Sequence, residues 1–105
     1  MGEWWFYLVA VFAGPLMVNG VPHFVNGVSG RKFPSPFSGG PGTEDTPVRN
    51  VLWGASNWLV GCLLLWLIRD GLGNPLILAE LIVLGLGFAV LLAMAFGDPE
   101  RFRRR

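Results

Sequence analysis

This sequence is short of charged residues, of cysteine and of histidine. Of its 105 residues, 14% are charged, whereas a soluble domain has about a quarter. The single cysteine, Cys62, excludes a disulfide within the chain, and a single histidine, His23, leaves no zinc-type Cys/His spacing. The net charge of +1 argues against a broad nucleic-acid-binding surface. Cys62 lies in an apolar run, where we expect a small buried side chain.

Reactive groups in catalytic arrangements are also missing. The sequence has no nucleotide-binding glycine loop, no combination of serine, histidine and aspartate within reach, and no paired carboxylates inside an apolar segment. These absences predict a protein that is not an enzyme and that has no metal site or resident cofactor.

Long apolar runs are what the sequence does contain. Hydrophobic residues make up 52% of the chain and concentrate in three runs, over residues 4–21, 51–68 and 76–96. About 20 helical residues cross a hydrocarbon core of roughly 30 Å, and none of the runs alternates as a barrel strand does. We therefore predict an all-α membrane protein with three transmembrane helices. It would form a single integral membrane domain over residues 1–105, with a connection over residues 22–50 and a basic tail over residues 97–105.

The basic residues predict the orientation of these helices. Seven of the eight fall on one side of the predicted membrane, and only Arg69 falls on the other. The seven are Arg31, Lys32 and Arg49 in the connection and Arg101, Arg103, Arg104 and Arg105 in the tail. Positive residues gather on the cytoplasmic side, so the C-terminus is predicted inside and the N-terminus outside.

The connection opens with an unusual stretch, "NGVPHFVNGVSGRKFPSPF", over residues 19–37. Its Asn-Gly pairs, its prolines and its repeated "VNGV" favour turns, while Phe24, Phe33 and Phe37 favour burial. We therefore predict a turn-rich, membrane-apposed segment with little helix over residues 22–37. Residues 38–47 are polar and glycine-rich and are predicted to be mobile, and Thr46-Pro47 is predicted to start the second helix.

The part of this stretch that reads "PHFVNGVSGRKFPSPF" resembles a motif shared by small bacterial multi-pass membrane proteins. No activity is known for that motif. The resemblance implies a bacterial inner-membrane setting and transfers no catalytic residue.

Small residues recur at helical spacing within the apolar runs and predict where helices pack. They are Ala10 and Gly14 in the first run, Gly54 and Gly61 in the second, and Gly85, Ala89, Ala93 and Gly97 in the third. Small residues let helix backbones approach closely in a membrane. We expect them to pack the three helices of one chain together. The alternative is that one stripe is left over for a second copy or a partner subunit.

Five residues are candidate ligand-binding positions: His23, Arg31, Lys32, Asn57 and Glu80. Asn57 is expected to bond the first or third helix, and Glu80 either faces water or couples a proton or cation, with Arg69 as its nearest basic partner. His23, with the two basic residues, suits a lipid phosphate, a quinone or one half of a shared haem site.

Three functions are compatible with these features. The first is a non-enzymatic accessory subunit or self-associating helix bundle, indicated by the small-residue stripes. The second is a minimal homo-oligomeric transporter or channel, indicated by Asn57, Glu80 and a predicted kink at Pro15. The third is a lipid- or quinone-binding membrane protein that uses His23. The expected partners are the lipid bilayer and a second copy or a larger membrane complex.

Overall fold

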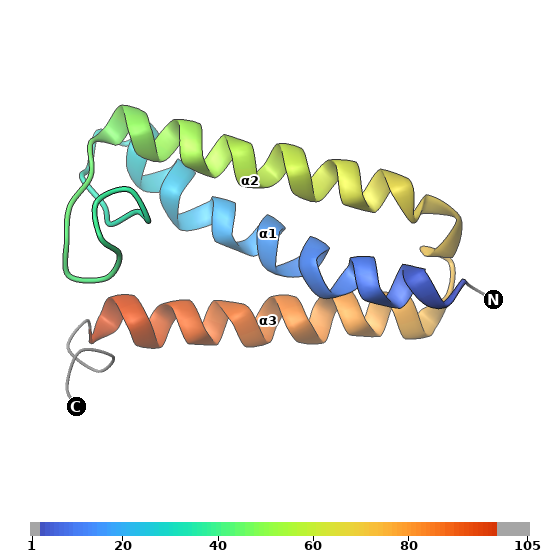
Figure 1. The fold of residues 1–105 in the computed structure, drawn as a ribbon. Helices are drawn as coiled ribbons and strands as arrows, with labels where there is room; N and C mark the ends of the chain where they lie inside the picture. Colours follow the sequence, from blue (N-terminus) through green and yellow to red (C-terminus); the bar gives the residue numbers. More distant parts are fainter. Residues whose placement is uncertain (1–2, 99–105) are drawn as a thin grey trace.

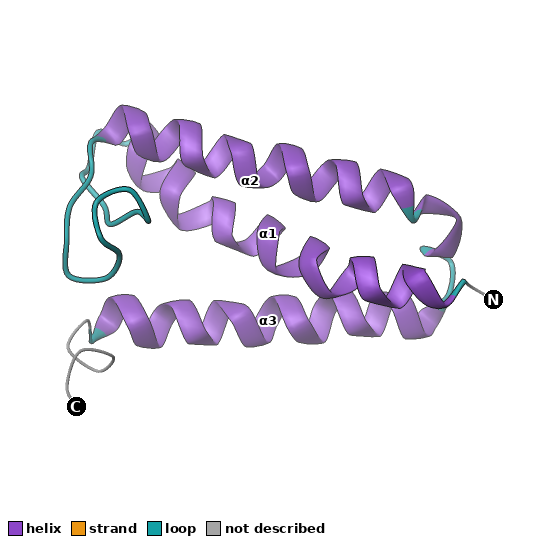
Figure 2. Ribbon diagram, viewed as in Figure 1, coloured by secondary structure: helices purple, strands orange, loops and turns teal. Residues whose placement is uncertain are grey.

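The computed structural model describes residues 3–98, and within them the chain forms three long helices joined by loops (Figures 1 and 2). Helix α1 spans Trp4–Val28, α2 spans Pro47–Leu67 and α3 spans Pro75–Gly97, with a short 3-10 helix η1 over Arg69–Gly71. All three long helices are long and apolar enough to cross a membrane. The predicted fold class is confirmed, and the chain is a multi-pass membrane protein. Most of the predicted basic tail lies outside the described residues.

Side-chain caps and prolines set the starts of α2 and α3. The Thr46 hydroxyl accepts a hydrogen bond from the Arg49 amide at 3.2 Å, and the Asn74 side chain accepts one from the Leu76 amide at 2.9 Å. A proline follows each cap. At this first helical position the backbone N–H has no acceptor within the helix, so the lack of an N–H in proline costs no hydrogen bond. The predicted helix start at Thr46-Pro47 is confirmed.

Helix α1 is longer than the sequence predicted, so the prediction of little helix after residue 21 is wrong. The helix continues through Pro22 to Val28 and includes both copies of "VNGV". The copies are seven residues apart, so Gly20 and Gly27 lie on one face of the helix, toward α2. The Asn26 amide donates to the Pro22 carbonyl at 2.8 Å, which accommodates this asparagine in the helix. Packing against α2 thus overrides the weak helix preference of the Asn-Gly pairs.

The backbones of α1 and α2 touch along these glycines. A Cβ atom placed on Gly54 would lie 2.7 Å from the Phe24 amide nitrogen and 2.8 Å from the Gly20 carbonyl oxygen. One placed on Gly27 would lie 2.6 Å from the Pro47 carbonyl oxygen. The buried residues of α2 are Asn50, Gly54, Asn57 and Gly61, all on the face that meets α1. Close approach of the two helices therefore depends on the absence of side chains at these positions.

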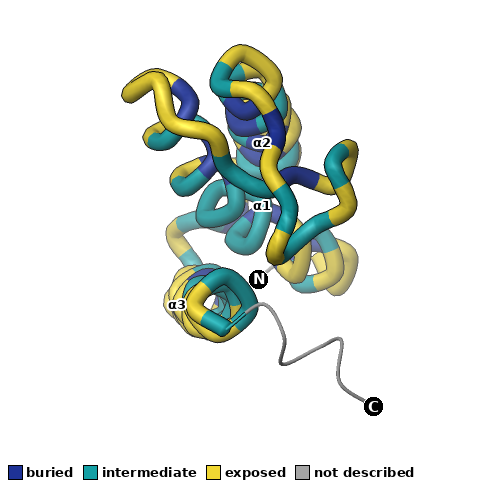
Figure 3. Tube along the Cα trace, turned by 90° about the vertical axis from the view of Figure 1, so that its left-hand side faces the viewer, coloured by how far each residue is buried: buried dark blue, intermediate teal, exposed yellow. Residues whose placement is uncertain are grey.

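Helix α3 packs against α1, and much of its surface is exposed (Figures 1 and 3). The two helices meet at Gly14 and Gly85, where a Cβ on Gly14 would lie 2.8 Å from a carbonyl oxygen of α3. Farther along α3, Ala89 is half-buried, while Ala93 and Gly97 are exposed. Of the small residues predicted to pack this helix, Gly85 lies in the contact between α1 and α3. Ala93 and Gly97 lie outside that contact.

The end of the bundle that holds the α2–α3 link is closed by apolar packing. The buried residues there are Phe6, Ala10, Ile68 and Ile77. Gly71 of η1 lies directly against the Phe6 ring, and the Asn74 amide donates to the Tyr7 hydroxyl at 3.1 Å. This end is therefore filled, in contrast to the opposite end.

Cys62 faces outward, so the prediction that it is buried is wrong. It is exposed on α2 together with large apolar side chains such as Leu59 and Leu63. The residue before it, Gly61, lies against α1, and a step of one residue turns about 100° around a helix. The outward face of α2 is that of a helix in lipid.

Candidate functional site

The connection between α1 and α2, residues 29–46, is a hydrogen-bonded loop at one end of the bundle (Figure 1). Phe33 and Asp45 form an antiparallel bridge, in which the Asp45 amide donates to the Phe33 carbonyl at 2.9 Å. The hydroxyl groups of Ser38 and Thr43 lie 2.7 Å apart, and Gly40 has a φ of +83°, which favours glycine. Residues 38–47, predicted to be mobile, are thus held by specific contacts.

Asp45 is the central acceptor of this loop. Its Oδ2 accepts a hydrogen bond from the Ser35 hydroxyl at 2.5 Å, and its Oδ1 accepts one from the Thr46 amide at 2.8 Å. Arg49 lies 3.4 Å from Oδ1 and forms an ion pair. The Ser35 hydroxyl, with help from Thr46 and Arg49, outweighs burial and holds the pKa of Asp45 below its usual value of 3.8. The loop is therefore built around a carboxylate.

Beneath this loop lies a cavity of about 300 Å³, which we call the His23 chamber. All three long helices and the connection contribute to its wall. The lining residues are Asn19 and His23 from α1, Pro34, Ser35, Pro36, Gly40 and Pro41 from the connection, Trp53 from α2, and Leu92, Ala95 and Phe96 from α3.

His23 is the most deeply placed titratable group in this wall. Its side chain is 2% exposed, and its Nδ1 lies 2.8 Å from the Asn50 Oδ1. Aromatic rings surround the imidazole edge to face, with ring centroids at 5.4 Å for Phe33, 6.4 Å for Trp53 and 6.3 Å for Phe96. The ring is thus held in one orientation by packing and by one hydrogen bond.

The neighbours of Asn50 decide which nitrogen of His23 carries the hydrogen. The Asn50 amide nitrogen donates to the carbonyls of Phe33 at 2.8 Å and Thr46 at 3.1 Å. Carbonyl groups only accept, so the amide oxygen of Asn50 must face His23 and the hydrogen must be on Nδ1. In the neutral imidazole, Nε2 is then a hydrogen-bond acceptor, and it has no partner among residues 3–98.

A second hydrogen-bonded pair, Asn57 of α2 and Asn19 of α1, repeats this arrangement one turn of α1 away from His23. The Asn57 amide nitrogen donates to the Trp53 carbonyl at 2.7 Å, so its oxygen accepts from the Asn19 amide at 3.0 Å. Asn57 is 3% exposed, and the structure places its partner on the first helix. Asn19 and His23 are four residues apart and line the same chamber. Two asparagines of α2 thus orient two polar residues of α1.

The chamber adjoins an apolar groove along the seam between α1 and α3, which we call the α1–α3 groove. Its first part, about 410 Å³, shares Leu92 and Phe96 with the chamber, and its second part, about 360 Å³, shares Val18 with the first. Apolar residues line both parts, and Gly14 and Gly85 line the second part as well. From Leu81 to Phe96 the groove follows α3 for roughly 22 Å at 1.5 Å per residue.

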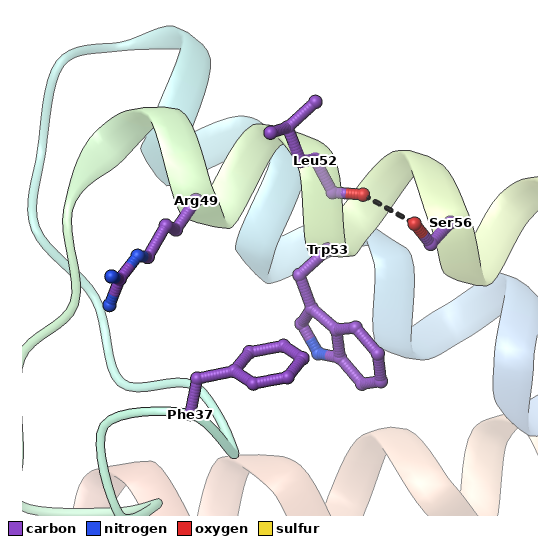
Figure 4. Close-up of a pocket in the computed structure, with 5 residues that line it drawn as sticks. All are labelled: Phe37, Arg49, Leu52, Trp53 and Ser56. Carbon is purple, nitrogen blue, oxygen red and sulfur yellow. Dashed lines mark hydrogen bonds between the residues drawn. The ribbon is translucent and has the colours of Figure 1, made fainter.

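A separate pocket of about 430 Å³ lies outside the chamber, between the connection and α2 (Figure 4). Its polar groups are already paired, because Ser56 donates to the Leu52 carbonyl at 2.7 Å and Arg49 pairs with Asp45. The exception is the Trp53 Nε1, which is buried without a partner among residues 3–98. Figure 4 shows this nitrogen on the side of the indole that faces Phe37, whose ring stands at 90° to it. The polar groups of this pocket are thus bonded within the protein or, at Trp53, buried.

The three phenylalanines predicted to pack the connection have different roles. Phe33 packs against His23 and against Phe96, with ring centroids 4.7 Å apart in the second pair. Phe24 belongs to α1 and packs on Trp58 at 4.7 Å, so its assignment to the connection is wrong. Phe37 is 68% exposed and touches Trp53 by its edge.

The charged candidates do not join His23. Arg31 and Lys32 are exposed, and the Arg31 Nε donates to the Asn26 side chain at 2.9 Å. Arg69 stacks on Trp66, with the guanidinium 3.9 Å from the ring centroid, rather than pairing with Glu80. One carboxylate oxygen of Glu80 is buried and has no partner among residues 3–98.

The residue that sequence reasoning missed at this site is Asn50. It is fully buried and makes the hydrogen bonds that define the chamber end of α2. A signal existed, because Asn50 lies seven residues before Asn57 and therefore on the same face of the helix. Asn50 was assigned to the predicted connection and not to the predicted second span, so it was not compared with Asn57 as a residue of the same helix face.

Comparison with known protein families, with curated proteins and with solved structures finds no match to this chain.

Proposed function

We propose that this chain is a non-enzymatic integral membrane protein that binds one amphiphilic molecule, a lipid or a quinone. The polar head would occupy the His23 chamber and the apolar tail would follow the α1–α3 groove. The observation that carries this proposal is the Nε2 atom of His23, an unpaired hydrogen-bonding group on a side chain that is 2% exposed. A ligand in the chamber would donate a hydrogen bond to this nitrogen, which no residue among 3–98 does.

The position of the chamber along the bundle suits an amphiphile. His23 lies five residues before the end of α1, or roughly 8 Å along the helix. Phe96 lies one residue before the end of α3, so the chamber is at the level where a membrane helix leaves the hydrocarbon. A polar head at this level and a tail directed along α3 match the depth profile of a membrane lipid or quinone.

The groove has room for a flexible apolar tail. The first part of the groove has about 410 Å³ and the second about 360 Å³. An acyl or prenyl chain fits these volumes.

A second candidate, the accessory subunit or self-associating bundle, is favoured by one observation. Ala93 and Gly97 are exposed on α3, which packs against the rest of the bundle through α1. Close helix approach by a second copy or a partner subunit would use such residues. The transporter alternative has less support, because Asn57 is engaged in joining α1 to α2 and Glu80 lies toward the other end of the bundle.

The proposed setting is a bacterial inner membrane, with the N-terminus outside and the C-terminus in the cytoplasm. The support is the excess of basic residues at one end together with the resemblance of residues 22–37 to small bacterial membrane proteins.

The test is to block the α1–α3 groove by a substitution and to measure by mass spectrometry which molecules remain bound. In Ala93→Phe, a ring would fill the first part of the groove, whereas Ala79→Phe adds the same ring at an exposed position of the same helix that lines neither part. Native mass spectrometry of the protein from gentle detergent, with extraction of bound molecules, would measure occupancy. We expect Ala93→Phe to lower the occupancy by an amphiphile at least about five-fold and Ala79→Phe to leave it unchanged.

The same spectra report the oligomeric state, which separates the two candidates. Loss of a dimer in Ala93→Phe without any change in bound amphiphile would refute the binding proposal and support self-association. Equal occupancy in wild type and both variants would also refute it.

A further inference from the structure

We infer that the amphiphile presents a hydroxyl group to His23, so its head is a neutral hydrogen-bond donor such as a hydroquinone or a glyceride alcohol. This inference rests on the proposed binding function and narrows it to one class of head. It excludes as preferred ligands an oxidised quinone, which offers only carbonyl acceptors, and an anionic phosphate head.

The hydrogen bonds around His23 decide which kind of head it accepts. Two backbone carbonyls hold the Asn50 amide so that its oxygen faces the imidazole, and this places the ring hydrogen on Nδ1. Nε2 of the neutral ring can then only accept. A ligand carbonyl or phosphate oxygen opposite Nε2 would set two acceptors against each other.

The other polar groups in the chamber wall do not discriminate between a donor head and an acceptor head. The Ser35 hydroxyl donates to Asp45 and accepts from the Phe37 amide, and the Trp53 Nε1 lies on the side of the indole that faces Phe37 and the separate pocket (Figure 4). Asn19 keeps an oxygen and one amide hydrogen, so it can serve either kind of partner. His23 is therefore the group that discriminates between heads.

The described part of the chamber wall has no positively charged side chain. Among the described residues, no lysine or arginine lines the chamber. Arg31 and Lys32 are exposed on the connection, and Arg49 faces Asp45. An anionic head would lose its hydration in the chamber without gaining an ionic partner there, which is costly.

The experiment compares pairs of ligands in which one member has a hydroxyl group that can donate a hydrogen bond and the other does not. The purified protein in nanodiscs is titrated with decylubiquinol and decylubiquinone, and separately with 1,2-dioctanoylglycerol and its 3-O-methyl ether. Quenching of tryptophan fluorescence gives the affinities. We expect the hydroxyl member of a pair to bind about ten-fold more tightly, the usual consequence of leaving one buried group unpaired.

His23→Gln provides the matched variant. A glutamine amide can rotate to present either its oxygen or its nitrogen, so the preference within a pair should fall to less than about two-fold while binding of the tail persists. If this variant does not fold, the comparison of ligands on the wild-type protein still decides the question.

The two pairs also identify the source of the hydroxyl group. Preference within the quinone pair alone points to a reduced quinone, and preference within the glyceride pair alone points to a lipid alcohol. Equal affinities within both pairs overturn this inference and leave the binding function standing. Tighter binding of the carbonyl or ether member also overturns it. Absence of binding by all four probes overturns it too, and the groove variants then decide separately whether another amphiphile is bound.

Discussion

Two asparagines of α2 decide what the polar residues of α1 present to the cavity. Asn50 and Asn57 each direct the amide nitrogen to a backbone carbonyl, so each turns its oxygen toward α1. The partner on α1 must then donate, and it keeps its remaining acceptor for the chamber. Both asparagines are nearly inaccessible to solvent, so their orientation has no competition from water.

Asp45 links the fold of the connection to pH. Because its pKa is lowered in the folded protein, the stabilisation is fully present above the unfolded value near 3.8 and is lost as the pH falls below that value. We expect the thermal midpoint of the wild-type protein in detergent to be constant from pH 7 to 5 and to fall between pH 4 and 3. Asp45→Asn should have a lower midpoint at pH 6 and a shallower decline below pH 4.

The control for this prediction is Glu44→Gln, which removes a neighbouring carboxylate that is exposed. Its pH profile should follow that of the wild type. If Asp45→Asn and the wild type decline in parallel below pH 4, the loop does not depend on the Asp45 carboxylate.

At the scale of elements, the contact between α1 and α2 depends on glycine. Gly54 faces two backbone atoms of α1 at less than 3 Å from where its Cβ would be, and backbone cannot move aside as a side chain can. The helices would have to separate, and the hydrogen bonds from His23 and Asn19 to α2 would lengthen with them. The chamber therefore exists only while this contact is close.

We expect Gly54→Ala to destabilise the protein by about 2–3 kcal/mol, in the upper range for an overpacked interior. Gly87→Ala is the matched control on α3, because nothing lies within 4 Å of its Cβ position. It should change stability by less than about 1 kcal/mol, since alanine is the better helix former. Reversible unfolding of the two variants in mixed micelles would measure both changes. Equal destabilisation would show that loss of glycine, and not the α1–α2 contact, is responsible.

At the scale of the whole molecule, the two ends of the bundle differ. The start of α1 and the α2–α3 link lie at one end, which is packed, and the connection lies with the end of α3 at the other, which contains the chamber (Figure 1). Arg31, Lys32 and Arg49 are at the chamber end. The head of a bound amphiphile would thus lie on the side that the positive residues predict to be cytoplasmic.

This orientation has a direct test. A reporter fused after residue 105 should score as cytoplasmic, and one inserted within residues 71–74 should score as external. The rule that basic residues stay on the cytoplasmic side predicts both results. The reverse pattern would place the chamber on the outer side and would exclude an amphiphile that enters from the cytoplasmic leaflet.

The sequence by itself determined the class of the protein and where α2 begins. Hydrocarbon requires each backbone polar group to be paired within its own segment, so a long apolar run becomes a helix whatever its neighbours are. Thr46-Pro47 predicted a helix start because a cap and a proline act locally, and the structure has the same pair at Asn74-Pro75. The sequence also singled out His23 and Asn57, since polar residues in or near an apolar run are few.

Only the tertiary structure decided how far α1 extends and what His23 can do. The glycines at positions 20 and 27 favour turns in isolation, and they lie in a helix because α2 rests directly on them. The hydrogen on the imidazole is set by Asn50, which is itself set by the carbonyl of Phe33 in the connection. Such a chain of partners joins three segments that are distant in sequence. Its outcome depends on which atoms meet across helices, and no local pattern contains that information.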